Sequence, residues 1–311
     1  MKSEVQILLS SYNGEKYIRE QLDSILKQEE VQLHLLIRDD GSTDGTKAIL
    51  SEYEQNCDNV KVLYGKNVGV IRSFFALMEA AEEGCPYIAF ADQDDVWLPD
   101  KLARAVSLLD KQEQSNRKKN RQGTPLVYCS ARQLVDAELR PLKQAIRYPE
   151  VRAEFGNALV ENMCTGCTCV INQAMLRLLK GRQPEFTVMH DFWIYLVGTC
   201  FGTVIYDKES RILYRQHGNN ELGSASSLFE NYKRRVKNYK KHRGQLGRQA
   251  SQLLMLYGEE MPVEKRELAE ELVGARKDKA TRKKLLKERK VFRQRKSDDW
   301  IFLMLLAAGK I

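Results

Sequence analysis

The sequence predicts an α/β fold built on a mostly parallel sheet flanked by helices. Short runs of strand-forming apolar residues alternate with stretches in which apolar residues recur at helical spacing. This alternation is typical of layered folds in which a helix connects two parallel strands. In addition, polar turns follow three of the first four predicted strands. The carboxyl ends of parallel strands form the edge where such sheets bind ligands, so these turns are candidate binding elements.

The elements follow from apolar periodicity taken in order along the chain. Ile18, Leu22 and Ile25 recur at helical spacing and predict the first helix. A second helix is expected around Ile49, a third through residue 80, and another after a cap at Asp100. Strands are expected at 5–9, 33–37, 60–63, 87–90 and 126–129.

Charge divides the chain into two parts. The 311 residues carry a net charge of +8, but the first hundred are acidic on balance, whereas Lys and Arg crowd residues 233–296. We therefore expect a catalytic domain over 1–223 and a basic helical extension over 224–311. The asymmetry indicates an anionic partner for the extension.

The expected compartment is the cytoplasm. Met1 leads within a few residues into a predicted strand, which argues against a signal peptide, and no apolar run approaches the roughly 20 residues of a membrane span. The seven cysteines form an odd set in core-like positions and are expected to be reduced thiols. Cys164-x-x-Cys167 lacks a second pair at zinc spacing and is interpreted as core or loop thiols.

The turn after the fourth strand concentrates negative charge. Asp92, Asp94 and Asp95 lie within four positions of one another. Carboxylates this close repel unless a cation or protons lie among them, and hard oxygen ligands suit Mg²⁺ or Mn²⁺ held against a diphosphate. The alternative is a solvated acidic turn that caps the next helix.

The turns after the first two strands are weaker candidates. Tyr12, Asn13 and Gly14 offer backbone amides suited to a phosphate or a base, and Asp39 could accept the imide N–H of uracil or thymine. An ordinary loop and a helix cap are the alternatives. Neither a G-x-G-x-x-G fingerprint nor a Walker lysine motif occurs.

Later residues supply candidates for proton transfer and phosphate binding. Asp191 lies beside aromatic residues and could act as a general base, and the alternative is a helix-start aspartate. Arg215 could face phosphate and His217 could bind the metal, although a lone histidine is commonly structural.

These motifs together resemble the family 2 glycosyltransferases. The resemblance rests on ILLSSYNGE (7–15), DDGSTDGT (39–46), NVG (67–69) and DQDD (92–95), in the family's order and spacing. It covers about residues 4–223 and implies the GT-A fold, a nucleotide-sugar donor and a divalent cation. HDFW and the YRQHGNNELG stretch are similar to the rhamnosyltransferase-type branch, whose bacterial members build surface polysaccharides.

The resemblance also implies roles for individual residues. Asp191 would be the catalytic base of an inverting reaction. Asp94 and His217 would bind the metal. The donor nucleotide would be bound by Ser11, Tyr12, Asn13, Asp39, Asp40, Gly69, Arg72, Asp92 and Gln93. The acceptor side would include Thr165, Gly166, His190, Trp193 and Arg215.

The same resemblance bounds the reaction. The Q-x-x-R-W element of processive synthases is absent, so we expect transfer of single sugars from a UDP- or dTDP-sugar to a glycan or lipid-linked acceptor. The sugar stays open, with rhamnose among the candidates. Two alternatives remain: a nucleotidyltransferase, which would usually carry a glycine-rich basic loop near the first strand, and a non-catalytic scaffold of an assembly complex.

The extension ends in an apolar run, 300–308, that suits a helix lying in the headgroup region of a membrane. Clustered cations beside it would add attraction to anionic lipid at the inner face of the cell membrane. The alternative is packing on the catalytic domain or on a second copy of the chain, as in a homodimer. Nucleic acid is not expected as a partner, because no aromatic platform accompanies the charges.

Overall fold

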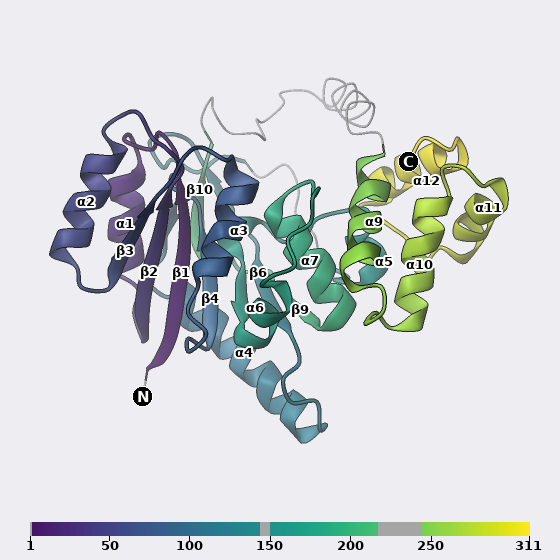
Figure 1. Ribbon diagram of the computed structural model, residues 1–311, viewed down its shortest axis with the longest axis horizontal. Coiled ribbons are helices and arrows are strands. Elements are labelled where there is room, and N and C mark those ends of the chain that lie inside the picture. The colour runs from purple at the N-terminus through teal and green to yellow at the C-terminus, as the bar shows by residue number, and fades with distance from the viewer. Residues whose placement is uncertain (1, 144–149, 217–243) are drawn as a thin grey trace. The chain divides into compact units, whose positions relative to one another are not determined.

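The computed structural model describes residues 2–143, 150–216 and 244–311. The chain forms two compact units, which we call the sheet unit and the helical unit (Figure 1). The sheet unit comprises Met1–Gln144, Cys164–Gln183 and Met189–Arg215, and the helical unit comprises Ala145–Met163, Pro184–Val188 and Gln216–Ile311. The predicted boundary between 223 and 224 lies outside the described residues and stays a prediction.

A seven-stranded sheet in the order β3-β2-β1-β4-β8-β6-β9 forms the sheet unit. Only β8 runs antiparallel to its neighbours, so the predicted mostly parallel α/β fold is confirmed. Every predicted strand lies within an observed one. The bounds are β1 Ser3–Ser11, β2 Val31–Asp39, β3 Val60–Tyr64, β4 Tyr87–Ala91, β6 Leu126–Ser130, β8 Val170–Asn172 and β9 Thr203–Asp207.

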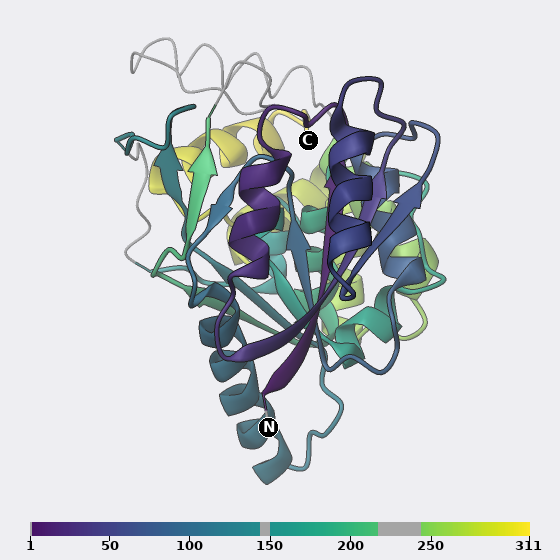
Figure 2. The ribbon, with the colours of Figure 1, turned by 90° about the vertical axis from the view of Figure 1, so that its left-hand side faces the viewer.

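Helices flank this sheet (Figures 1 and 2). Their buried faces carry the apolar residues that recur at helical spacing, such as Ile18, Leu22 and Ile25 of the first helix, which are fully buried. The helices of the sheet unit are α1 Ile18–Leu26, α2 Thr46–Asn56, α3 Val70–Ala80, α4 Lys101–Lys118, α6 Gln173–Leu179, α7 His190–Phe201 and the 3₁₀ turn Gly166–Thr168.

A second, three-stranded sheet in the order β5-β10-β7 was not predicted. Its strands β5 Val96–Trp97, β10 Ile212–Arg215 and β7 Gln133–Val135 are two to four residues long. Strands this short give little periodicity to read from sequence. Because β5 follows the acidic turn directly, this small sheet fixes the position of that turn.

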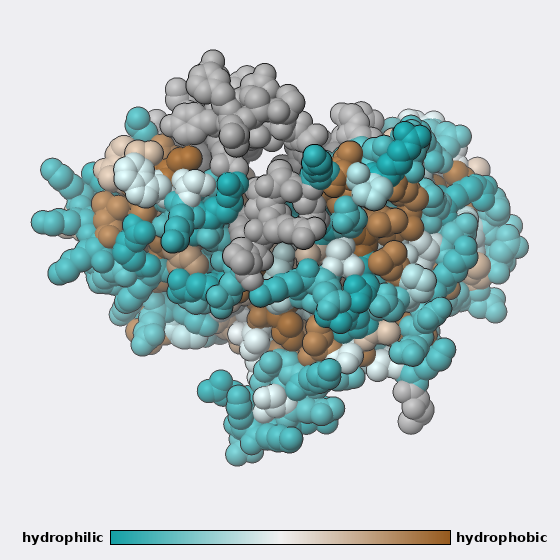
Figure 3. All heavy atoms as spheres, turned by 180° about the vertical axis from the view of Figure 1, so that it is seen from behind, coloured by the Kyte–Doolittle hydropathy of each residue, from teal (hydrophilic) through white to brown (hydrophobic). Residues whose placement is uncertain are grey.

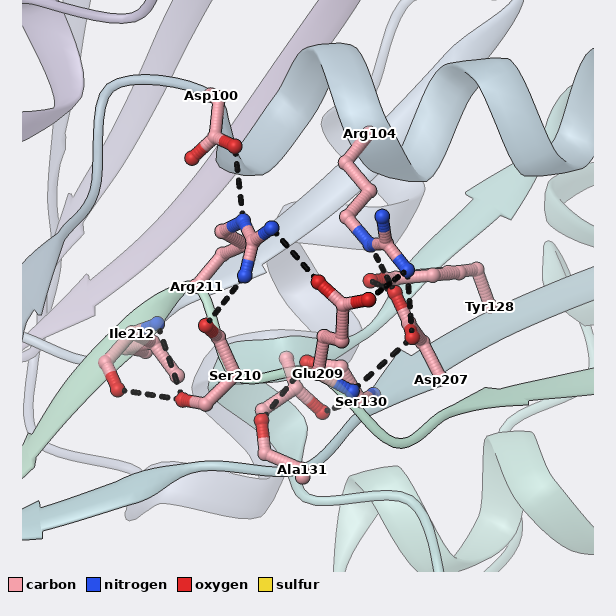
Figure 4. A network of polar contacts seen from close by, with 11 residues as sticks. Asp100, Arg104, Tyr128, Ser130, Ala131, Asp207, Glu209, Ser210, Arg211 and Ile212 are labelled. Carbon is pink, nitrogen blue, oxygen red and sulfur yellow. Dashed lines mark hydrogen bonds and ion pairs between the residues drawn. The ribbon is translucent and has the colours of Figure 1, made fainter.

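A polar network ties α4 to the segment between β9 and β10 (Figure 4). The buried carboxylate of Asp207 pairs with Arg104 and accepts a hydrogen bond of 3.1 Å from the hydroxyl of Tyr128. Arg211 donates hydrogen bonds of 2.8 Å each to Asp100 and Glu209. The network therefore anchors the end of the chain segment that leaves the acidic turn.

The helical unit confirms the predicted helical character of the extension. Its helices are α5 Phe155–Ala158, α9 Gln245–Tyr257, α10 Val263–Gly274, α11 Lys279–Glu288 and α12 Lys296–Ala307. Leu253, Tyr257, Leu272, Leu285 and Phe302 form its buried interior. No helix among the described residues is long and apolar enough to span a bilayer.

Candidate active site

The turns that follow β1, β2 and β4 are bonded to one another at the carboxyl edge of the sheet. Gln93 Oε1 accepts hydrogen bonds from the Ser11 hydroxyl (2.9 Å) and the Tyr12 amide (2.8 Å), and Gln93 Nε2 donates to the Tyr12 carbonyl (3.0 Å). Asn13 Oδ1 accepts from the Thr43 amide (2.8 Å). The structure therefore brings together three of the predicted motifs, those at 7–15, 39–46 and 92–95.

The amides of the first turn are already occupied. Those of Tyr12, Asn13 and Gly14 donate to Gln93 Oε1, the Ser42 hydroxyl and the Thr46 hydroxyl at 2.8–2.9 Å. In this structure the amides that were expected to suit a phosphate or a base thus donate to side chains of the protein, and donor binding by this turn stays a prediction. Each donor is satisfied by a neighbouring turn, which leaves the turn rigid instead of open.

Asp39 is a buried carboxylate with one oxygen in use. Its Oδ2 accepts hydrogen bonds from the amides of Gly41 (3.2 Å) and Ser42 (3.1 Å). Its Oδ1 is buried and has no hydrogen-bond partner within the described part of the chain. Gly41 has φ +83°, and a Cβ there would lie 2.9 Å from the Asn67 amide nitrogen, so glycine is required.

Both carboxylate oxygens of Asp40 are bound by other groups of the protein. Its carboxylate forms a buried ion pair with Arg38 and accepts hydrogen bonds of 2.9 Å from the amides of Val68 and Gly69. Arg38 also donates to the Lys66 carbonyl at 3.1 Å. Asp40 thus holds the loop that precedes α3. A direct contact between Asp40 and a donor stays a prediction.

Gly69 and Arg72 lie where that loop enters α3. Gly69 has φ +82° immediately before the helix, a backbone conformation that glycine adopts readily. The exposed Arg72, in the first turn of α3, donates a hydrogen bond of 3.1 Å to Gln183 Oε1. Donor binding by these two residues also stays a prediction.

The acidic turn after β4 contains a cluster that could hold a cation. Ligand atoms of Asp92, Asp95 and Cys167 all lie within 4.8 Å of one another. Burial, then repulsion by Asp95, Asp94 and Asp191, raises the pKa of Asp92 well above its usual range. Burial and the neighbouring Asp94 raise the pKa of Asp95 to about 7. A divalent cation would relieve this repulsion, so the residues fit the metal that the resemblance implies.

One more observation supports that fit. Asp95 Oδ1 accepts the Arg215 amide at 3.1 Å, but Asp95 Oδ2 is buried and has no hydrogen-bond partner among the residues described. A buried carboxylate oxygen without a hydrogen-bond partner is available to coordinate a cation. Cys167 was not predicted to lie here, because nothing in the sequence marks a cysteine 72 residues after Asp95 as its neighbour.

Arg215 is a buried residue that hydrogen-bonds to the acidic turn. It is 2% exposed, its Nε donates to the Asp94 carbonyl at 2.8 Å, and its Nη atoms bind the Ala137 carbonyl and the Glu20 carboxylate. The structure therefore places this guanidinium inside the protein and not toward an open phosphate site. The chain enters the undescribed segment two residues later, so His217 lies outside the described residues.

Asp191 lies in the first turn of α7. Its carboxylate is hydrogen-bonded to Gly166, which directly precedes Cys167 of the acidic cluster. Its Oδ2 accepts the Gly166 amide at 2.8 Å. A Cβ on Gly166 would lie 2.9 Å from His190 Nε2 and 3.5 Å from Asp191 Oδ2, so the close approach depends on glycine. Arg132 was not predicted from the sequence. It donates a hydrogen bond of 2.6 Å to the Thr165 hydroxyl, and its guanidinium lies over the Tyr214 ring.

His190 and Trp193 belong to the interior of α7. The His190 ring stacks on Phe74 with 3.9 Å between centroids, and neither ring nitrogen has a hydrogen-bond partner in the described ranges. Burial lowers the pKa of His190 to about 3, so the imidazole is neutral. Trp193 is 0% exposed. The helix α7 is buried on nearly every side, and a role of this indole in an acceptor site stays a prediction.

Comparison with known proteins identifies the architecture. Residues 6–176 match the family model Glycosyl transferase family 2. The chain belongs to this family. It is 30% identical over 237 residues to the dTDP-rhamnosyl transferase RfbG of Shigella flexneri, a match that covers 73% of this chain and 77% of the relative. The family and the rhamnosyltransferase-like resemblance predicted from the motifs are thereby confirmed.

Other relatives point the same way. An uncharacterized glycosyltransferase of Nostoc is 32% identical over 235 residues, covering 73% of this chain and 69% of the relative. The putative teichuronic acid biosynthesis glycosyltransferase TuaG of Bacillus subtilis is 35% identical over 106 residues, covering 34% and 41%. Both relatives are named glycosyltransferases, and the second is named for teichuronic acid biosynthesis.

Solved structures show the same fold. S. aureus TarS (residues 1–349), solved with UDP-GlcNAc, superposes with a TM-score of 0.57 at 18% identity, covering 87% of this chain and 70% of TarS. The sheet topology and this likeness together establish the GT-A fold.

Proposed function

We propose that this glycosyltransferase moves a single sugar, with inversion, from a nucleotide-diphosphate sugar to a hydroxyl of a glycan or lipid-linked acceptor in bacterial surface polysaccharide synthesis. One observation carries the proposal. Gly166 binds the candidate base Asp191, and the next residue, Cys167, lies against Asp92 and Asp95. Two consecutive residues thus join the base to the acidic turn, as transfer from a metal-bound diphosphate requires.

The donor is proposed to be a UDP- or dTDP-sugar. The free Oδ1 of Asp39, buried at the sheet edge, is an acceptor that suits the imide N–H shared by uracil and thymine. The relative RfbG is named a dTDP-rhamnosyl transferase, and TarS was solved with UDP-GlcNAc. Both precedents support this pair of bases, and RfbG makes rhamnose the first sugar to test.

A divalent cation, Mg²⁺ or Mn²⁺, is proposed to be held by carboxylates of Asp92, Asp94 and Asp95, with His217 as a further predicted ligand. When bound, the cation would offset the charge on the departing diphosphate. A mannosyltransferase from Pyrobaculum calidifontis with a similar fold, at a TM-score of 0.50 and 13% identity, was solved with GDP-Man and Mn²⁺. The crowded carboxylates of the present chain supply the independent support.

Asp191 is proposed to accept the proton of the acceptor hydroxyl as its oxygen forms a bond to the anomeric carbon. The bond between that carbon and the diphosphate oxygen breaks on the opposite face, which inverts the configuration. The Gly166 amide fixes the carboxylate in place, and Arg132 holds the neighbouring Thr165. Both contacts orient the base before the substrate arrives.

The proposed setting is the cytoplasmic face of the cell membrane, where lipid-linked acceptors present their sugars. The basic helical extension supports this setting, since it would attract anionic lipid.

The decisive test replaces Asp191 with Asn, which keeps the shape but removes the base. We expect transfer from dTDP-rhamnose or UDP-GlcNAc to fall by about a thousandfold, while calorimetry shows unchanged nucleotide affinity. Asp58→Asn, at an exposed site, is the matched control. Loss of nucleotide binding in Asp191→Asn would contradict the role of Asp191. A wild type that binds nucleotides and transfers no sugar would favour the scaffold.

A further inference from the structure

Helix α12 presents an apolar row to solvent. Lys296, Trp300, Met304 and Ala308 are spaced by four residues and therefore lie along one side of the helix. Trp300 is 68% exposed and Met304 46% exposed, while Phe302 and Leu306 on the other side are buried in the helical unit. The predicted apolar run 300–308 is thus divided between the interior and this outward row, which we call the α12 row.

An exposed tryptophan is unusual in this chain. The chain has three tryptophans, and the other two, Trp97 and Trp193, are 2% and 0% exposed. Burying an indole releases several times the free energy gained from a small side chain. An exposed Trp and Met on one helix side therefore indicate a surface that is covered by a partner.

Cations lie at both ends of the α12 row. Lys296 begins it and Lys310 follows it, and both are exposed. The acidic Asp299 does not oppose them, because it pairs with Arg289 at 3.0 Å and accepts the Arg293 amide at 2.9 Å. The arrangement is an apolar centre with positively charged ends.

The neighbouring helix adds more positive charge. Helix α11 packs against α12, and the Arg289–Asp299 pair joins the end of α11 to the start of α12. Exposed cations without an ion pair among the described residues lie on and just before α11. They are Arg276, Lys277, Lys279, Lys283 and Lys287. In Figure 3, hydrophobic residues of the helical unit reach the surface among hydrophilic ones at the left of the view.

We propose that the α12 row, with the cations of α11, is a docking surface for an anionic lipid bilayer, in which α12 lies in the plane of the headgroups. Trp and Met enter the boundary between headgroups and acyl chains, and Lys side chains reach back to lipid phosphates. This deepens the membrane setting of the proposed function, although docking itself requires no sugar transfer.

The other occupants fit these residues less well. A soluble polyanion, nucleic acid included, would use the cations but leave Trp300 and Met304 exposed to water. A second copy of the chain on a twofold axis would bring the cations of one copy against the same cations of the other. A bilayer with anionic headgroups satisfies both the apolar and the cationic residues.

Fluorescence of the full chain tests the proposal directly, because the exposed indole dominates any change in solvent exposure. Vesicles of phosphatidylcholine with phosphatidylglycerol should shift the emission to the blue, and brominated acyl chains should quench it. Phosphatidylcholine alone should give a much weaker effect. Trp300→Phe should abolish both changes.

Co-sedimentation with the same vesicles separates the contribution of the apolar side chains to membrane binding from that of the lysines. Trp300→Ala with Met304→Ala should lower vesicle binding by about tenfold, and Lys296→Glu with Lys310→Glu by a similar factor. The matched controls are Met255→Ala, an apolar residue 69% exposed on α9, and Lys118→Glu with Lys119→Glu in the sheet unit. The controls should bind like wild type.

Three outcomes would overturn the proposal. These are equal binding to neutral and anionic vesicles, vesicle binding that needs the cations but leaves Trp300 unquenched, and a blue shift that depends on protein concentration without vesicles. The last would indicate a second copy as the occupant. Transfer to a water-soluble acceptor should be unchanged in all of these variants, so failure of docking and failure of the proposed enzyme activity are distinguishable.

Discussion

Two acidic turns lie at the same edge of the sheet, with similar composition and opposite surroundings. After β2, the two oxygens of Asp40 are matched by Arg38 and by the amides of Val68 and Gly69. After β4, Asp92 and Asp95 lie against each other and against Cys167, and burial with mutual repulsion raises their pKa values. The carboxylate of Asp40 is therefore electrically satisfied by the protein, whereas the carboxylates of Asp92 and Asp95 are not.

The difference shows that the number of donors around a carboxylate, and not the number of carboxylates, separates a structural turn from a ligand site. A satisfied carboxylate stabilises the fold, and its removal leaves a buried arginine without a partner. An unsatisfied cluster raises the free energy of the empty protein and is relieved by a bound cation. The two turns should therefore respond in opposite ways to the same substitution.

The largest effect is expected in the unsatisfied turn. Asp92→Asn should lower sugar transfer by about a thousandfold, because it removes a proposed ligand of the cation, while the free energy of unfolding stays equal or rises. Transfer assays and urea denaturation of the metal-free protein measure the two quantities. A variant that is both inactive and clearly less stable would show that Asp92 is structural.

In the turn after β2, substitution of Asp40 should mainly lower the stability of the fold. Asp40→Asn leaves Arg38 buried without its ion-pair partner and should lower the free energy of unfolding by about 3 kcal/mol. Glu52→Gln, which removes the exposed ion pair with Arg19, is the matched control and should cost below about 1 kcal/mol. Equal losses in urea denaturation would remove the distinction between buried and exposed pairs.

Stability should depend on pH through the unsatisfied turn. The folded-state pKa of Asp95 is about 7, above its usual 3.8, so the folded protein binds the proton more tightly. In chelator, this carboxyl stabilises the fold below about pH 4, and that contribution of about 2–4 kcal/mol is lost as the pH rises to 7. Asp95→Asn should flatten this part of the curve. An unchanged slope would mean that Asp95 titrates normally.

The smallest effect concerns the buried cation behind the acidic turn. Lys101 Nζ lies 3.5 Å over the Trp97 ring, and burial lowers the pKa of Lys101 to about 8. Burial of the charged Lys101 side chain destabilises the fold. This free-energy cost is present in full below about pH 8 and declines between pH 8 and 10.5. Lys101→Met should therefore stabilise the protein by about 1 kcal/mol at pH 7 and by less at pH 9.5, measured by urea denaturation at both values. A destabilised variant would show that the cation is needed by Asp95.

Much of the fold was predictable because its elements carry their own periodicity. The strand Val60–Tyr64 and the helix Val70–Ala80 were predicted almost to the residue, since apolar spacing and a glycine before the helix mark them. The three short strands β5, β7 and β10 were missed because two to four residues give no period. The recruitment of 145–163 and 184–188 into the helical unit depends on long-range packing that no local pattern records.

The candidate site was predictable in its residue types and less so in their partners. The sequence placed Asp39, Asp92 and Asp94 at strand ends along one sheet edge, and the structure has them at the end of β2 and in the turn after β4. The buried contacts of Asp40 and Arg215 could not be predicted from sequence, because apart from Arg38, which is two residues from Asp40, the partners described here lie 28 to 195 residues away. Their roles as donor or acceptor contacts stay predictions.

Calorimetric titration with UDP and with dTDP, each with and without Mn²⁺, tests most directly whether the unsatisfied turn is a cation-dependent donor site. We predict that one of the two nucleotides binds, that Mn²⁺ strengthens its binding, and that Asp94→Ala abolishes the strengthening while leaving the protein folded. Nucleotide binding that is indifferent to Mn²⁺, or no binding under any of the four conditions, would contradict the assignment of the acidic turn.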